Sequence, residues 1–121
     1  MGRDRFGNVV FVLTSSLFGV PPKGFSAYVS AKYYLLGLMR SFVSEYSHLG
    51  VTFNAVSPSM IDTGFLEKFP DITVEISAKH SPLKRNLKPE DIVVSIQYLL
   101  SDSASSLNGV NIPITGGASI H

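Results

Sequence analysis

The chain has no cysteine, which excludes a disulfide framework and a thiolate metal site. It also has little net charge, because ten Lys and Arg residues against nine Asp and Glu residues give a formal charge of +1. That balance argues against the strong positive field typical of proteins that bind nucleic acid or anionic membranes. The histidines His48, His80 and His121 are far apart and lack the spacing of metal ligands. We therefore expect no metal site and no nucleic-acid partner.

Long apolar stretches are also missing. The longest apolar run, Val9 to Leu13, is far shorter than the ~20 residues that cross a membrane. Residues Met1 to Gly7 are polar and do not resemble a signal peptide. We therefore expect a cytoplasmic protein without a membrane partner. The length of 121 residues predicts a single domain at most, and we treat 1–121 as one unit.

Buried strands and amphipathic helices alternate along the chain. The unbroken apolar run Val9 to Leu13 predicts a strand that is covered on both faces. Val51 to Val56 and Gly109 to Ile114 predict a second and a third strand. Residues Ala27 to His48 have helical periodicity, with Ser26 as the expected N-cap and Gly50 as the expected stop. The predicted apolar face of this helix is formed by Ala27, Ala31, Leu35, Leu38, Phe42 and Tyr46.

A second helix is expected to begin at Pro89, because proline followed by Glu90 and Asp91 suits a first turn. Its predicted apolar face is formed by Ile92, Val93, Ile96, Leu99 and Leu100. Between the two helices, residues 64 to 88 predict only weak helical patches, around Phe65 to Phe69 and Val74 to His80. This order of elements predicts an α/β fold with about three parallel strands and right-handed crossovers.

Two side chains suited to proton transfer lie one helical turn apart. Tyr28 and Lys32 are four residues apart on the predicted helix and therefore share a face. A phenol can protonate a carbonyl oxygen, and a neighbouring ammonium stabilises the phenolate that is left. The alternative is an ordinary helix tyrosine beside a lysine that extends to solvent. Upstream, the Thr14-Ser15-Ser16 loop brings hydroxyl groups within plausible reach, unless these only satisfy a turn at the strand end.

Four stretches, taken in order, resemble the short-chain dehydrogenase/reductase family. The first two are the Ser15-Ser16 loop after a buried strand and the Tyr28-x-x-x-Lys32 pair. The other two are Asn54 to Pro58 leading to Thr63, and Ser81 to Arg85 continuing to Gly116-Gly117. The resemblance covers nearly the whole chain but only the C-terminal half of a full-length member. The last stretch is most like 3-oxoacyl-[acyl-carrier-protein] reductases.

The resemblance implies a fold, a reaction and a set of site residues. The fold would be the C-terminal half of a Rossmann-like doubly wound parallel sheet. The reaction would be hydride transfer between NAD(H) or NADP(H) and a small carbonyl or alcohol substrate, such as a 3-oxoacyl thioester. Catalysis would fall to Ser16, Tyr28 and Lys32, with Ser15 as the alternative to Ser16. The choice of Ser16 follows the family's Ser-x-x-Gly pattern, which Gly19 completes.

Cofactor contacts are also implied by the resemblance. Tyr28 and Lys32 would lie at the nicotinamide ribose, and Thr63 and the backbone at Ile61 would hold the carboxamide. Thr63 also suits an N-cap of a following helix. Phe65, Leu66, Phe69 and Ile72 lie where the family has its substrate lid, although ordinary packing explains them equally well.

The family's glycine-rich phosphate loop, G-x-x-x-G-x-G, does not occur in these 121 residues, and neither does its active-site asparagine. We therefore expect the chain alone to be inactive and to bind no cofactor tightly. A non-catalytic association module derived from the family is the alternative function. In either case we expect a homo-oligomer, or pairing with the missing half, because an apolar strand edge would otherwise be open.

Three further features of the sequence bear on the details of the site. Ser59 stands where the family has glycine after the proline, so strain is expected if its φ is positive. Leu49 stands where some carrier-protein reductases have arginine, which weakens the case for an acyl-carrier partner. A basic group formed by Lys84, Arg85 and Lys88 suits either a phosphorylated partner or, more simply, a solvated face.

Overall fold

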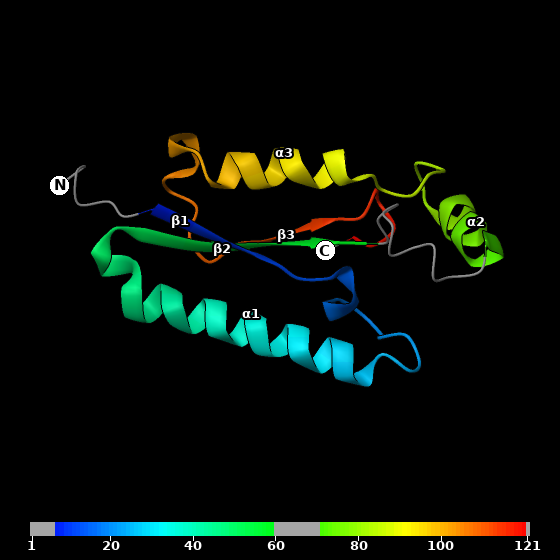
Figure 1. The fold of residues 1–121 in the computed structure, drawn as a ribbon, viewed down its shortest axis with the longest axis horizontal. Coiled ribbons are helices and arrows are strands. Elements are labelled where there is room, and N and C mark those ends of the chain that lie inside the picture. The colour runs from blue at the N-terminus through cyan, green and yellow to red at the C-terminus, as the bar shows by residue number, and fades with distance from the viewer. Residues whose placement is uncertain (1–6, 60–70, 121) are drawn as a thin grey trace.

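Three parallel strands form one sheet, with helices on both of its faces (Figure 1). Our computed structural model describes residues 7–59 and 71–120. The strands β1 (Gly7–Val12), β2 (Val51–Pro58) and β3 (Asn111–Ile114) lie in the order β1-β2-β3. Strand β1 pairs with β2 starting at Gly7 opposite Val51, and β2 pairs with β3 starting at Ala55 opposite Asn111. The predicted α/β fold with three parallel strands is therefore confirmed.

The two long helices cover opposite faces of the sheet. Phe53 and Ala55 of β2 belong to the core formed with α1 (Ser26–Tyr46), whereas Val56 belongs to the core formed with α3 (Pro89–Leu99). Side chains alternate between the two faces along a strand, so these cores lie on opposite sides of β2. Figure 1 shows α1 and α3 on either side of the sheet.

This arrangement corrects the expected handedness of the crossovers. Both connections move the chain in the same direction across the sheet, from β1 to β2 and from β2 to β3. Since their helices lie on opposite faces, the two crossovers must have opposite hands, and they cannot both be right-handed as predicted. The second connection is long and includes the additional helix α2 (Asp71–His80), which gives the chain length to cross to the other face.

The packed face of α1 differs from the face that its periodicity predicted. Val29 and Met39 are the buried residues of α1. Ala27, Ala31 and Tyr46 of the predicted face are exposed. Partly buried residues pack beside the buried pair, and these are Leu35, Leu36, Phe42 and Val43. The helix is apolar around much of its circumference, so sequence periodicity could not identify the side that meets the sheet.

Most element boundaries moved by one or two residues, for local reasons. Strand β1 begins at Gly7, where the Thr52 hydroxyl donates to Asn8 Oδ1 at 2.6 Å and extends the pairing. Phe25, not Ser26, is the N-cap residue of α1. Strand β3 begins only at Asn111, because Gly109 has a φ of 88°. Helix α3 begins at Pro89 as predicted, but Val93 and Leu100 of its predicted apolar face are exposed.

A buried asparagine fastens β2 to the turn before β3. Asn54 is fully buried in the middle of β2. Its amide nitrogen donates to the Leu107 carbonyl at 2.9 Å, and its amide oxygen accepts from the Val110 N–H at 3.0 Å. Both partners lie in the turn before β3, so this side chain holds the turn at the sheet.

No helix within the described ranges has the length and apolar character required to cross a membrane.

Candidate active site

The motif stretches converge at one edge of the sheet. In a parallel sheet, the carboxyl ends of all strands lie at the same edge, and ligands of open α/β folds bind there. The Ser15–Leu17 turn follows β1, Ser59 follows β2, and Gly116-Gly117 follows β3. Helix α1, which begins after the β1 loop, starts near the same edge. Sequence segments that are about one hundred residues apart are thereby brought to one region.

Tyr28 and Lys32 lie together on the first turns of α1. Lys32 Nζ is 5.7 Å from the centroid of the Tyr28 ring. The ring of Phe25 meets Tyr28 edge-on, with centroids 6.0 Å apart, and so limits the directions in which the phenol can turn. Tyr28 remains 46% exposed, so its hydroxyl is accessible to a molecule in solution.

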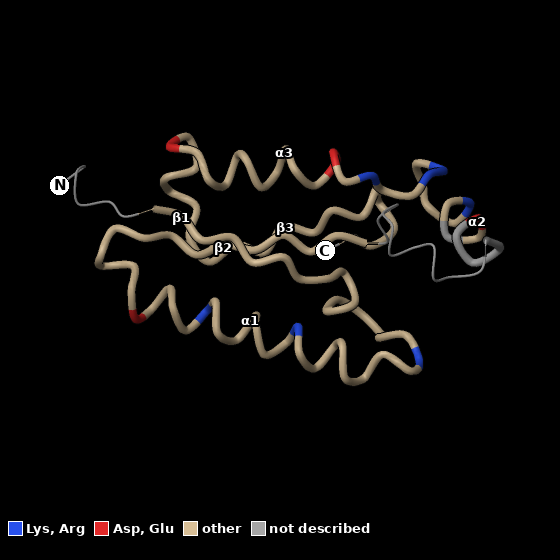
Figure 2. Tube along the Cα trace, viewed as in Figure 1, with Lys and Arg blue, Asp and Glu red and all other residues tan. Residues whose placement is uncertain are grey.

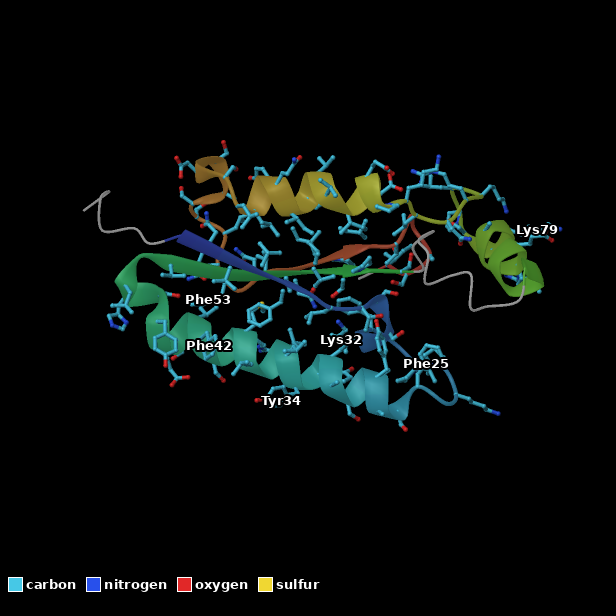
Figure 3. All side chains as sticks on the ribbon, viewed as in Figure 1. Phe25, Lys32, Tyr34, Phe42, Phe53 and Lys79 are labelled. Carbon is cyan, nitrogen blue, oxygen red and sulfur yellow. The ribbon has the colours of Figure 1, made fainter. Side chains whose placement is uncertain are left out.

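Lys32 also connects α1 to the end of β1. Its Nζ donates to the Val12 carbonyl at 2.9 Å (Figure 3). In Figure 3, Lys32 lies on the side of α1 that faces the sheet, whereas Tyr34 points away from it. The ammonium carries three N–H donors, so two remain for other acceptors after this bond. The charge of Lys32 is thus held at the sheet edge beside Tyr28.

The serine loop forms a short 3₁₀ turn over Ser15–Leu17, within a segment where the sequence predicted only a loop. The Thr14 hydroxyl caps the turn by accepting from the Ser16 N–H at 3.2 Å. The N–H groups of Leu17 and Phe18 donate to the carbonyls of Thr14 and Ser15 and close the turn. Ser15 and Ser16 are both partly buried, so burial does not choose between them.

The turn is also fastened to α1. Tyr33, which follows Lys32 directly, donates its hydroxyl to the Leu17 carbonyl at 2.7 Å. The sequence analysis missed this residue. Its spacing of four from the buried Val29 was the available signal, because that spacing places both on one face of the helix.

The predicted cofactor residues Ile61 and Thr63 lie outside the described residues, as do Phe65, Leu66 and Phe69 of the expected lid. Ile72 lies in α2. Ser59 is described, and its N–H donates to the Ile114 carbonyl at 3.0 Å. Among the described non-glycine residues only Lys84 has a positive φ, so the strain considered for Ser59 does not arise.

The two ends of the fourth motif stretch, Ser81-Pro82 and Gly116-Gly117, pack against each other. Gly116 and Gly117 have φ values of 62° and 88°, in the left-handed region that favours glycine. A Cβ atom on Gly117 would lie 3.2 Å from Pro82 Cγ, and one on Gly116 would lie 3.3 Å from the Ser81 hydroxyl oxygen. The glycine pair therefore allows the Ser81-Pro82 segment to approach the end of β3.

The basic group near α3 is partly neutralised within the chain. Arg85 forms a two-pronged ion pair with Asp91, at 2.8 and 3.3 Å. The hydrogen bond from Arg85 lowers the pKa of the Asp91 carboxyl, and the Lys88 backbone N–H lowers it further. Lys84 Nζ donates to the Lys79 carbonyl at 3.1 Å. Figure 2 shows basic residues around the turn between α2 and α3. Arg85 is thus paired within the chain, and the choice between a phosphorylated partner and a solvated basic face stays a prediction.

Comparisons with known proteins agree with the geometry. A family model described as enoyl-(acyl carrier protein) reductase matches residues 1–119. Among curated proteins, protein MoaE of Klebsiella aerogenes is 35% identical, over 96% of this chain and 49% of its own length. The 3-oxoacyl-[acyl-carrier-protein] reductase FabG of Thermotoga maritima is 32% identical, over 97% of this chain and 47% of its own.

A solved structure gives the same result. The ligand-free aldohexose dehydrogenase of Thermoplasma acidophilum superposes with a TM-score of 0.87 at 27% identity. The match covers 98% of this chain and 50% of that one. The chain thus spans about half the length of the relatives it matches. It belongs to the short-chain dehydrogenase/reductase family.

Proposed function

We propose that this chain supplies the catalytic half of an NAD(P)-dependent oxidoreductase that interconverts a carbonyl and an alcohol. The observation that carries the proposal is the placement of Tyr28 and Lys32 on one end of α1, beside the Ser15–Leu17 turn. The names of the relatives support the reaction class, since one is a 3-oxoacyl reductase and another an aldohexose dehydrogenase. A cytoplasmic location is part of the proposal.

Tyr28, Lys32 and a serine of the turn each have a defined part in this scheme. When bound, the nicotinamide cofactor supplies or accepts the hydride. Tyr28 Oη gives its proton to the carbonyl oxygen during reduction and takes it back during oxidation. Lys32 stabilises the phenolate with its charge, and its two remaining N–H donors suit the hydroxyls of a ribose. Ser16, with Ser15 as the alternative, donates a hydrogen bond to the same carbonyl oxygen.

The remaining cofactor contacts are assigned by family resemblance. Thr63 and the backbone at Ile61 would hold the nicotinamide carboxamide. The substrate would be a small ketone or alcohol, or a 3-oxoacyl thioester as in FabG. Leu49, where some carrier-protein reductases have arginine, favours the small molecule over a carrier-bound one. The choice between NAD and NADP belongs to the other half of the fold, which contacts the adenosine ribose.

Cofactor binding tests whether the missing half is needed. We define the joined protein as residues 7–121 placed behind the phosphate-loop half of the Thermotoga reductase. Titration of NADH and NADPH in a calorimeter is expected to show binding by the joined protein and none by the chain alone at micromolar concentration. Tight, stoichiometric binding by the chain alone would refute the division of labour. A folded joined protein that binds neither cofactor would support the non-catalytic association module.

We expect self-association whether the chain is a catalytic half or a non-catalytic association module. Strand β1 lies at the edge of the described sheet, and its Val9 and Val12 are 39% and 45% exposed. An open apolar strand edge is a template for another chain. We therefore expect the 121-residue protein to form a dimer or larger assembly, which light scattering measures directly. A stable monomer at high concentration would contradict this expectation.

Replacing Lys32 with alanine tests the assigned role of the ammonium. In the joined protein, turnover should fall, because the phenolate that forms at Tyr28 during reduction loses its neighbouring charge. Cofactor affinity should fall about tenfold or more, since hydrogen bonds from charged groups are stronger than neutral ones. The control is Lys23→Ala, at an exposed lysine in the loop before α1. Unchanged turnover and cofactor affinity in Lys32→Ala would show that Lys32 is structural.

A further inference from the structure

We propose that Tyr33 is a positioning residue that holds the serine turn at a fixed place relative to Tyr28. The inference rests on the proposed function for its catalytic consequence, but not for its structural part. The Tyr33 hydroxyl donates to the Leu17 carbonyl at 2.7 Å, a usual length for an O–H···O bond, and links residues sixteen positions apart.

Leu17 is the last residue of the 3₁₀ turn, and the chain leaves the regular structure after it. Its side chain is buried in the same core as Val29, one helical turn before Tyr33. Leu17 is therefore attached to α1 twice, by apolar packing at its side chain and by a hydrogen bond at its carbonyl. Packing restricts where the turn lies, and the directional hydrogen bond restricts how the turn is oriented.

This attachment fixes the neighbouring serine. Ser16 precedes Leu17 directly, so their Cα atoms are about 3.8 Å apart. Tyr28 lies five residues before Tyr33 in the same helix, about 7.5 Å along its axis. A rigid helix thus carries both the proposed proton donor and the phenol that holds the turn. The Thr14 cap stabilises the turn internally, and the Tyr33 hydroxyl bonds the turn to α1.

Removing the Tyr33 hydroxyl should affect catalysis and not the stability of the whole fold. Catalysis needs the serine hydroxyl and the tyrosine hydroxyl at the same carbonyl oxygen, and small displacements of such groups lower the rate strongly. Without the Tyr33 hydroxyl, the turn is still packed through Leu17 but is free to tilt. Substrate turnover should therefore fall while cofactor affinity, which depends on Lys32 and on the other half of the fold, stays unchanged.

The test compares Tyr33→Phe with Tyr34→Phe, the same change at the next residue, whose side chain is 70% exposed and points away from the sheet. Amide hydrogen exchange of the 121-residue protein should become about three- to tenfold faster at Leu17 and Phe18 in Tyr33→Phe, as expected for the loss of one hydrogen bond. Exchange at Ala55 in the centre of β2 should not change. Tyr34→Phe should alter none of these positions.

A second readout addresses catalysis. In the joined protein, Tyr33→Phe should lower kcat about tenfold and leave the Kd for NADPH within about twofold. Unchanged exchange at the turn, a uniform rise across turn and β2, or an unchanged kcat would each overturn the proposal. If the unsubstituted joined protein is inactive but exchange rises at the turn alone, the proposed function fails and the anchoring of the turn is supported.

Discussion

The substitution Tyr28→Phe in the joined protein is expected to lower the turnover number by about 10²- to 10⁴-fold, the range typical for general acid–base catalysis. Phenylalanine keeps the ring that packs edge-on against Phe25 but removes the proton donor. Because Tyr28 is 46% exposed, its hydroxyl contributes little to the stability of the folded protein. The melting temperature should therefore stay unchanged, and cofactor affinity should change much less than turnover.

The control for this experiment is Tyr34→Phe, which removes a hydroxyl from the far side of the same helix. Turnover of that variant should match the unsubstituted joined protein. If Tyr28→Phe retains near-normal turnover, another group donates the proton, and the assignment of Tyr28 is wrong.

The substitution Asn54→Leu should have the largest effect on stability. Leucine has nearly the same shape as asparagine but offers no donor or acceptor to the Leu107 carbonyl and the Val110 N–H. A buried polar group without a partner costs about 1–3 kcal/mol, and two groups are affected here. We expect the free energy of unfolding to fall by roughly 2–6 kcal/mol, measured by urea titration at one protein concentration.

Asn108→Ala provides the comparison. Asn108 lies in the turn before β3 and also fixes it, because its side chain accepts from the Phe53 N–H and donates to the Ser47 hydroxyl. Since Asn108 is exposed, water can replace part of these bonds, and a loss of about 1 kcal/mol is expected. An Asn54→Leu variant as stable as Asn108→Ala would mean that Asn54 does not hold the turn.

The fold could be predicted to the extent that it depends on local pattern. Short segments rich in β-branched residues predicted all three strands, and Pro89 marked the start of α3. The packed side of α1 could not be predicted, because apolar residues lie around much of that helix and only the sheet selects Val29 and Met39. The opposite hands of the two crossovers were missed for a similar reason, since the long second connection obeys no local rule.

The candidate site, like the fold, could be predicted only where it depends on local spacing. The four-residue spacing of Tyr28 and Lys32 is a local feature and was sufficient to place them together. The spacing of Tyr33 from Val29 indicates only which face of the helix it occupies, and its bond to Leu17, sixteen residues away, appears only after folding. Ile61 and Thr63, predicted by resemblance, lie outside the described residues, and their role stays a prediction.

Turnover of the joined protein tests the central claim most directly. The assay follows NADPH and NADH oxidation with a panel of small ketones, aldoses and 3-oxoacyl thioesters, after calorimetry has shown that the protein binds cofactor. We expect reduction of at least one carbonyl compound, with activity lost in Tyr28→Phe and retained in Tyr34→Phe. A folded, cofactor-binding joined protein that reduces none of these compounds, or whose activity survives Tyr28→Phe, would contradict the claim that this chain supplies the catalytic half.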